Sequence, residues 1–181
     1  LRSGAKPGDD VCVSGALGDA ALAVAAMTGR TRLDGDAFDA ARARLETPEP
    51  RIALGHALRG VATAAIDVSD GLVGDLAHIL ERSDVGATVE LPAIPRSPAL
   101  ARLVGGAERA LALECLLAGG DDYELCFTAP RAAADRVAAI AASTQLPVAR
   151  IGTITEGPGL VVRDERGVPL PAVPRAFDHF A

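Results

Sequence analysis

The sequence is poor in aromatic side chains, since it contains no Trp, one Tyr and four Phe. About half of it is nonetheless apolar (49%), so Ala, Leu, Val and Ile must build the core. No stretch approaches the ~20 uninterrupted apolar residues of a membrane span. We therefore expect residues 1–181 to form a single domain with no membrane segment.

The sequence also lacks a dense cluster of Lys and Arg, and its formal net charge at pH 7 is −6. A protein surface that binds nucleic acid is normally a basic patch. This charge distribution predicts that nucleic acid is not a partner of this chain.

Cysteine is rare, and the three residues Cys12, Cys115 and Cys126 are odd in number and far apart. Cys12 and Cys126 lie in apolar strand-like runs, and Cys115 lies in an apolar helical run. This placement predicts buried free thiols rather than disulfides or zinc ligands. Free thiols indicate a reducing compartment, and there is no charged-then-apolar leader, so we expect a cytoplasmic protein. The chain does not start with Met, and we expect it to be the back part of a longer protein.

Strand-like and helix-like apolar patterns alternate along the chain. Strands are predicted at residues 11–14, 61–66, 86–91, 123–128 and 148–153. Helices are predicted at residues 19–28, 36–45, 51–58, 72–82, 108–117 and 130–143. Residues 91–98 are predicted to be a loop, residues 102–109 an exposed surface and residues 160–170 a hairpin. The alternation indicates an α/β protein or an α+β sandwich with helices packed on the sheet.

The segment that follows the predicted strand at 61–66 carries two carboxylates and a hydroxyl, those of Asp67, Ser69 and Asp70. In α/β proteins ligands bind at the carboxyl ends of strands. Two carboxylates and a hydroxyl, without a nearby His or Cys pair, suit a hard cation such as Mg²⁺. In the alternative interpretation Asp70 or Ser69 is only a helix N-cap, but that role leaves Asp67 unexplained.

Seven segments together resemble one family in their order and spacing. They are Arg2-Ser3-Gly4-Ala5-Lys6-Pro7-Gly8-Asp9, Gly15-Ala16-Leu17-Gly18-Asp19, Pro48-Glu49-Pro50-Arg51, Ala65-Ile66-Asp67-Val68-Ser69-Asp70-Gly71-Leu72, Gly119-Gly120-Asp121-Asp122-Tyr123-Glu124-Leu125-Cys126-Phe127, Arg150-Ile151-Gly152 and Phe177-Asp178-His179-Phe180. The chain resembles the carboxyl-terminal half of the thiamine-monophosphate kinase family along essentially its whole length. The fourth and fifth segments are specific as a pair.

This resemblance implies the fold of the carboxyl-terminal domain of the aminoimidazole ribonucleotide synthetase-like superfamily, a mixed sheet covered by helices. In that superfamily an amino-terminal half forms a shared barrel in the homodimer and binds further Mg²⁺ ions and nucleotide phosphates. We expect that half to be missing from this chain, and the chain alone to be inactive.

The implied reaction transfers the γ-phosphoryl group of ATP to thiamine monophosphate. The resemblance implies that Asp67 and Asp70 bind Mg²⁺, that Ser69 contacts ATP and that Arg2 contacts the ATP phosphates. The acceptor is already an anion near pH 7, because the second pKa of a phosphomonoester is about 6. No general base is needed, and the remaining obstacle is repulsion between two polyanions, which metal ions and a fixed cation reduce.

The resemblance also implies a subsite for thiamine. Asp121 stands where the family usually has Glu, a residue that contacts the thiamine moiety, and Phe177 matches an aromatic residue that touches the substrate. The thiazolium ring is a permanent cation, for which an acid and an aromatic face are suitable partners. As alternatives, Asp121 caps the strand that follows it and Phe177 fills the core.

Two other functions remain open from the sequence. One is a synthetase or dehydratase of the same superfamily that phosphorylates an amide or carboxamide oxygen. The other is a ligand-binding module that catalyses no reaction.

Overall fold

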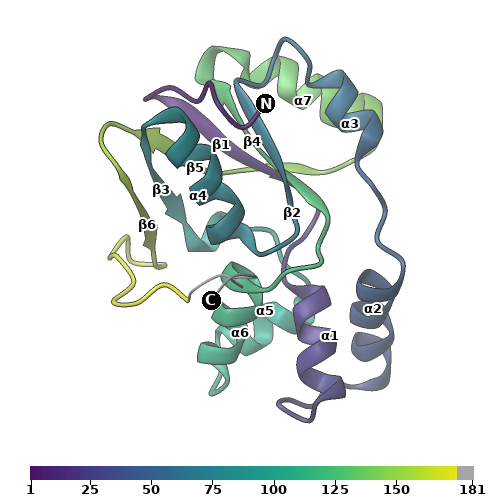
Figure 1. Ribbon diagram of the computed structural model, residues 1–181. Helices are drawn as coiled ribbons and strands as arrows, with labels where there is room; N and C mark the ends of the chain where they lie inside the picture. Colours follow the sequence, from purple (N-terminus) through teal and green to yellow (C-terminus); the bar gives the residue numbers. More distant parts are fainter. Residues whose placement is uncertain (175–181) are drawn as a thin grey trace.

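The computed structural model describes residues 1–174, in which six strands form one mixed sheet in the order β2-β4-β1-β5-β3-β6 (Figure 1). The strands are β1 (Asp9–Ser14), β2 (Ala64–Val68), β3 (Gly86–Glu90), β4 (Glu124–Pro130), β5 (Val148–Thr155) and β6 (Gly159–Arg163). All neighbours pair antiparallel except β3 and β6, which are parallel. The predicted mixed α/β sheet is therefore confirmed.

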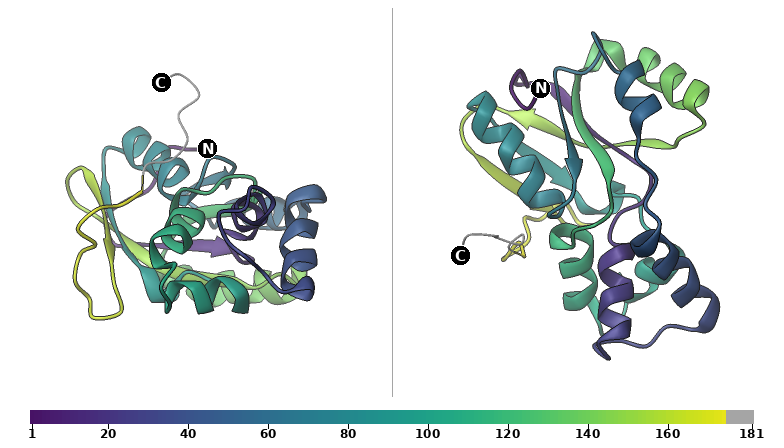
Figure 2. Two further views of the ribbon diagram at one scale, coloured as in Figure 1. Left: turned by 90° about the horizontal axis from the view of Figure 1, so that it is seen from below. Right: turned by 45° about the vertical axis from the view of Figure 1, so that its right-hand side comes forward.

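Helices cover both faces of this sheet and also extend beyond one of its ends. They are α1 (Asp19–Met27), α2 (Gly35–Glu46), α3 (Ile52–Ala57), α4 (Leu72–Ser83), α5 (Pro98–Val104), α6 (Arg109–Ala118) and α7 (Ala134–Thr144), with short 3₁₀ turns at Leu91–Ala93 and Arg131–Ala133. Helices α3 and α7 lie on one face and α4 on the other (Figure 1). Helices α1, α2, α5 and α6 gather beyond the end where β1 and β2 finish and β4 begins (Figure 2).

The two faces of the sheet are built by the strand period of two. In β1, Val11 and Val13 belong to the large core under α4, whereas Cys12 belongs to a smaller core under α3 and α7. All three cysteines are buried free thiols, as the sequence predicts. No helix within residues 1–174 is long and apolar enough to cross a membrane.

Strand β2 begins later than the apolar run at 61–66 predicts. The backbone N–H groups of Val61 and Ala62 donate to the carbonyl oxygen of Leu58, at 3.0 and 2.9 Å, and so close a turn after α3. Asp67 is therefore the fourth residue of β2 rather than the residue after the strand. Asp67 alternates with the buried Ile66 and Val68 and so points to the opposite face of the sheet, where its side chain is exposed.

Helix α5 was not predicted: it begins at the end of the predicted loop and runs into the predicted surface stretch, whose residues are mostly exposed as expected. Ser97 caps this helix, since its Oγ accepts from the Leu100 N–H at 3.2 Å, and Pro98 occupies the first turn. The predicted hairpin at 160–170 is only partly formed. Its second strand is reduced to one bridge between Arg163 and Pro169, and the strand partner of β6 is β3.

Candidate active site

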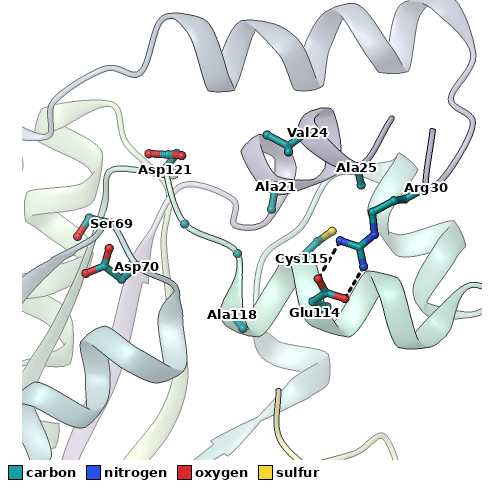
Figure 3. A pocket seen from close by; sticks show the side chains of 12 residues that line it. Ala21, Val24, Ala25, Arg30, Ser69, Asp70, Glu114, Cys115, Ala118 and Asp121 are labelled. Atoms are coloured by element: carbon teal, nitrogen blue, oxygen red, sulfur yellow. Dashed lines mark hydrogen bonds and ion pairs between the residues drawn. The ribbon is translucent and has the colours of Figure 1, made fainter. Parts of the chain in front are cut away.

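A pocket of about 390 Å³ opens between α1, α6 and the two loops that follow β2 and precede β4 (Figure 3). Ser69, Asp70 and Asp121 line one end of it. The remaining lining residues are Ala21, Val24, Ala25, Arg30, Glu114, Cys115, Ala118, Gly119 and Gly120. The structure thus brings together three of the residues that the sequence singles out, from segments about 50 residues apart.

The two loops at this end are held together through their backbones. The Asp121 N–H donates to the Ser69 carbonyl at 3.0 Å, and the Tyr123 N–H donates to the Val68 carbonyl at 2.9 Å. A Cβ atom at Gly120 would collide with the Ser69 carbonyl oxygen, so only Gly permits this approach. This packing gives a physical reason why the two segments occur as a pair.

Asp75 supports the acid corner of the pocket, which is formed by Ser69, Asp70 and Asp121. Sequence reasoning missed this residue. Its buried Oδ2 accepts from the backbone N–H groups of Ser69 and Asp70, at 2.9 and 3.0 Å. Gly71 occupies the N-cap position of α4, so the N-cap alternative for Ser69 and Asp70 was wrong. The available signal was an acid in the first helical turn, on the face that the helix buries.

Negative charge accumulates around this corner. The pKa of Tyr123 is raised, chiefly by the charge of Asp121, then by partial burial and by a hydrogen bond with Asp121, with further contributions from Asp67 and Asp70. Burial raises the pKa of Asp75, and the charges of Asp70 and Asp67 add to that rise against its two hydrogen bonds. The charges of Asp67 and Asp70 therefore act on both Asp75 and Tyr123, and like charges so arranged favour a bound cation.

Asp67 and Arg2 lie outside the pocket. Asp67 faces a separate groove of about 560 Å³ along the open edge of β2, which Leu1 also lines. The Leu1 carbonyl accepts from the Ala65 N–H at 2.9 Å, so the start of the chain runs beside β2. Arg2 is exposed and does not line the pocket that contains Ser69. Phe177 lies outside the described residues.

Mg²⁺ suits part of this arrangement. Within residues 1–174, no group of three or more His, Cys, Asp or Glu side chains could hold a metal by itself. However, Mg²⁺ is usually bound by one or two carboxylates together with water and substrate phosphates. Asp67 and Asp70 have the chemistry of such a partial donor set, in which water and phosphates would complete the coordination.

Glu124, the first residue of β4, is a buried hub of ion pairs. It accepts from Ser14 Oγ at 2.5 Å, from Arg44 at 2.5 Å and from Arg51 at 2.8 and 2.6 Å. Burial alone would raise its pKa, but the hydrogen bonds from Arg51, Ser14 and Arg44 outweigh it and hold the pKa below its usual value. Glu124 therefore fixes the point where the Asp121 loop joins β4. Arg51 of the Pro-Glu-Pro-Arg segment is one of its ion-pair partners.

Asp122 connects this loop to the start of α1. Its Oδ2 accepts from the Gly18 N–H at 2.8 Å, while its buried Oδ1 has no hydrogen-bond partner in the part of the chain that the structure describes. Burial raises the pKa of Asp122 to about 7 against the hydrogen bond from Gly18, and the charge of Asp19 adds to the rise. The side chain next to Asp121 thus anchors the loop to a pocket wall.

Residues 6–165 match the family described as AIR synthase related protein, C-terminal domain, and the chain belongs to this family. Among named relatives, it is similar to the thiamine-monophosphate kinase of Escherichia coli (strain K12), with 42% identity over 183 residues that cover 99% of this chain and 55% of the relative. The chain therefore spans about half the length of the curated relatives it matches.

Two solved structures extend the similarity. The thiamine-monophosphate kinase from Stenotrophomonas maltophilia K279a superposes with a TM-score of 0.82 and 44% identity, over 93% of this chain and 53% of the other. The structure of AaThiL complexed with AMPPCP and TMP gives a TM-score of 0.78 and 30% identity, over 99% of this chain and 53% of the other.

Proposed function

We propose that this chain is the carboxyl-terminal part of a kinase that transfers the γ-phosphoryl group of ATP to thiamine monophosphate and forms thiamine diphosphate. One observation carries the proposal: Ser69, Asp70 and Asp121 line one pocket, in a fold shared with a protein solved with AMPPCP and TMP. The amino-terminal part of the full protein would supply the rest of the site.

In this proposal the acid corner is the phosphate end of the pocket. Asp67 and Asp70 would hold Mg²⁺, which when bound would neutralise the phosphate oxygens and align the two substrates. The Ser69 hydroxyl would donate to an ATP oxygen, and Arg2 would add a fixed positive charge that pairs well with phosphate. Asp75, by fixing the Ser69 and Asp70 backbone, positions both side chains.

Asp121 would hold the thiazolium cation of the acceptor by charge attraction. Its backbone is in the left-handed region (φ 66°), fixed by its hydrogen bond to Ser69. This backbone conformation sets the direction of the Asp121 side chain, which is shorter than that of Glu. The proposed contact with the thiazolium cation depends on that direction. Phe177 would cover the same ring. We also propose that the full protein is a cytoplasmic homodimer that dimerises through its amino-terminal half.

The test uses the full-length protein, ATP, thiamine monophosphate and Mg²⁺, with thiamine diphosphate measured by chromatography and ADP by a coupled assay. We expect both products in equal amounts and no reaction when Mg²⁺ is chelated. Asp121→Asn should raise the KM for thiamine monophosphate, whereas Asp39→Asn, on the exposed side of α2, should not. ADP formation with a carboxamide acceptor, but not with thiamine monophosphate, would instead support the synthetase or dehydratase alternative.

A further inference from the structure

The pocket ends, opposite the acid corner, at an ion pair between Arg30 and Glu114 (Figure 3). The guanidinium and the carboxylate meet through two parallel hydrogen bonds, Nη1 to Oε1 at 2.9 Å and Nη2 to Oε2 at 2.7 Å. Glu114 projects from the middle of α6. Arg30 follows the end of α1, where its N–H donates to the Ala25 carbonyl at 2.8 Å. Both side chains therefore start from fixed backbone.

The Arg30–Glu114 ion pair contributes little to the stability of the fold. The two side chains are 51% and 50% exposed, and exposed ion pairs contribute at most about 1 kcal/mol. Arg42 and Glu46 on α2 form a pair of the same exposure, 50% and 49%, away from the pocket. The Arg30–Glu114 pair differs from it in facing a cavity.

The chemistry of the pair suits a flat ring that carries an amino group. Each carboxylate oxygen keeps a lone pair beyond its bond to Arg30, and the guanidinium keeps N–H groups beyond its bonds to Glu114. Together they offer acceptors beside donors in one plane. The wall between this pair and the acid corner is mostly apolar, from Ala21, Val24 and Ala118, and suits the faces of an aromatic ring. A volume of about 390 Å³ is within the ~300–1,000 Å³ range of ligand pockets.

We propose that the Arg30–Glu114 pair recognises the edge of an amino-substituted heteroaromatic ring whose phosphorylated end lies at the Asp70 and Asp121 corner. This inference rests on the proposed function, in which two ligands have that chemistry, namely the adenine of ATP and the aminopyrimidine of thiamine monophosphate. Glu114 accepts from the exocyclic amino group, and Arg30 holds the carboxylate in the plane of the ring. The two residues that select the ring then lie at the opposite end of the pocket from the phosphates.

The test is a steady-state comparison in the full-length protein. Glu114→Gln keeps the size of the side chain and removes its charge, and Arg30→Lys keeps the charge and removes the planar fork. Glu46→Gln is the matched control in the equally exposed pair. The KM values for ATP and thiamine monophosphate are measured separately. Each substrate is also compared with its oxo analogue, inosine triphosphate or oxythiamine monophosphate, in which oxygen replaces the amino group.

We expect Glu114→Gln to raise the KM of one substrate by about tenfold or more, the effect of losing a hydrogen bond to a charged group, with kcat little changed. The same variant should lose most of the preference for the amino substrate over its oxo analogue. Arg30→Lys should show a weaker form of both effects. A higher KM for ATP assigns the pair to adenine, and a higher KM for thiamine monophosphate assigns it to the aminopyrimidine.

The inference is overturned if the wild-type protein is active and both KM values stay unchanged in the two variants, or if Glu46→Gln has the same effect as Glu114→Gln. An inactive wild type would instead contradict the proposed function. In that case calorimetry measures the binding of ATP and of thiamine monophosphate to the wild type and to Glu114→Gln. An unchanged Kd, or no binding of either ligand to the wild type, overturns the inference.

Discussion

Asp122→Asn should change how the stability of this protein depends on pH. Asp122 is buried beside Asp121, with one oxygen on the Gly18 N–H and the other without a hydrogen-bond partner among residues 1–174. Asn has the same shape, and its carbonyl oxygen can accept from Gly18. Its amide nitrogen then takes the place of the unpartnered oxygen. The substitution therefore removes the titration while it keeps the packing.

The sign follows from proton binding. Burial raises the pKa of Asp122 to about 7 in the folded protein, from 3.8 for an unperturbed Asp. The folded state holds the proton more tightly, so the free energy of unfolding falls as pH rises from about 4 to about 7. A difference of about 3 units at ~1.36 kcal/mol per unit gives a loss of about 4 kcal/mol, as an order of magnitude. The Asp122→Asn variant lacks this carboxyl group, so its free energy of unfolding should not show this loss.

The assay is urea unfolding of the wild type and of Asp122→Asn at several pH values from 4 to 8, followed by circular dichroism. The free energy of unfolding of the variant minus that of the wild type should increase by several kcal/mol across this range. Asp39→Asn, which removes one exposed carboxylate from α2, controls for the loss of a charge alone. A difference that stays flat from pH 4 to 8 would refute the reasoning about Asp122.

Three further predictions concern the ion-pair hub, the metal corner and the chain as a folding unit. Glu124→Gln should lower the free energy of unfolding by about 3 kcal/mol, because it leaves the largely buried Arg51 with only the exposed Glu49 as a charge partner; urea unfolding measures this, and a loss no greater than that of Glu46→Gln would contradict it. Asp67→Asn in the full-length protein should reduce turnover far more than stability, since an exposed edge-strand side chain adds little to folding; near-normal turnover at saturating Mg²⁺ would remove Asp67 from the metal site. Residues 1–181 alone should melt cooperatively and release no ADP; kinase activity from this chain would show that the active site is misplaced.

Local patterns were sufficient to predict most elements and part of the site. The helix period from Leu72 onward and the Gly119-Gly120 break give α4 and the end of α6 nearly to the residue. The acid-rich segment at 67–70 was singled out because acids and a hydroxyl follow an apolar run. The structure places Ser69, Asp70 and Asp121 in one pocket, which agrees with their prediction as site residues without testing their roles.

What the sequence could not show depends on contacts between distant segments. The partners of Glu124 lie 73 to 110 residues away, so its role as a hub has no local signal. Asp67 lies in a groove separate from Ser69, along the open edge of β2, and the sequence does not show that β2 is an edge strand. Helix α5 was missed although Ser97-Pro98 is a typical helix start, because the surrounding prolines favoured a loop.

The most direct test of the central claim, that the acid corner is the metal and phosphate end of the site, is a crystal structure of the full-length protein. It should be solved with a non-hydrolysable ATP analogue, thiamine monophosphate and Mn²⁺ as an anomalous substitute for Mg²⁺. We predict a metal ion at coordination distance, about 2.1 Å, from a carboxylate oxygen of Asp67 or Asp70, with the thiazolium ring beside Asp121. Metal ions bound only by residues outside these carboxylates, with thiamine monophosphate away from Asp121, would contradict the account.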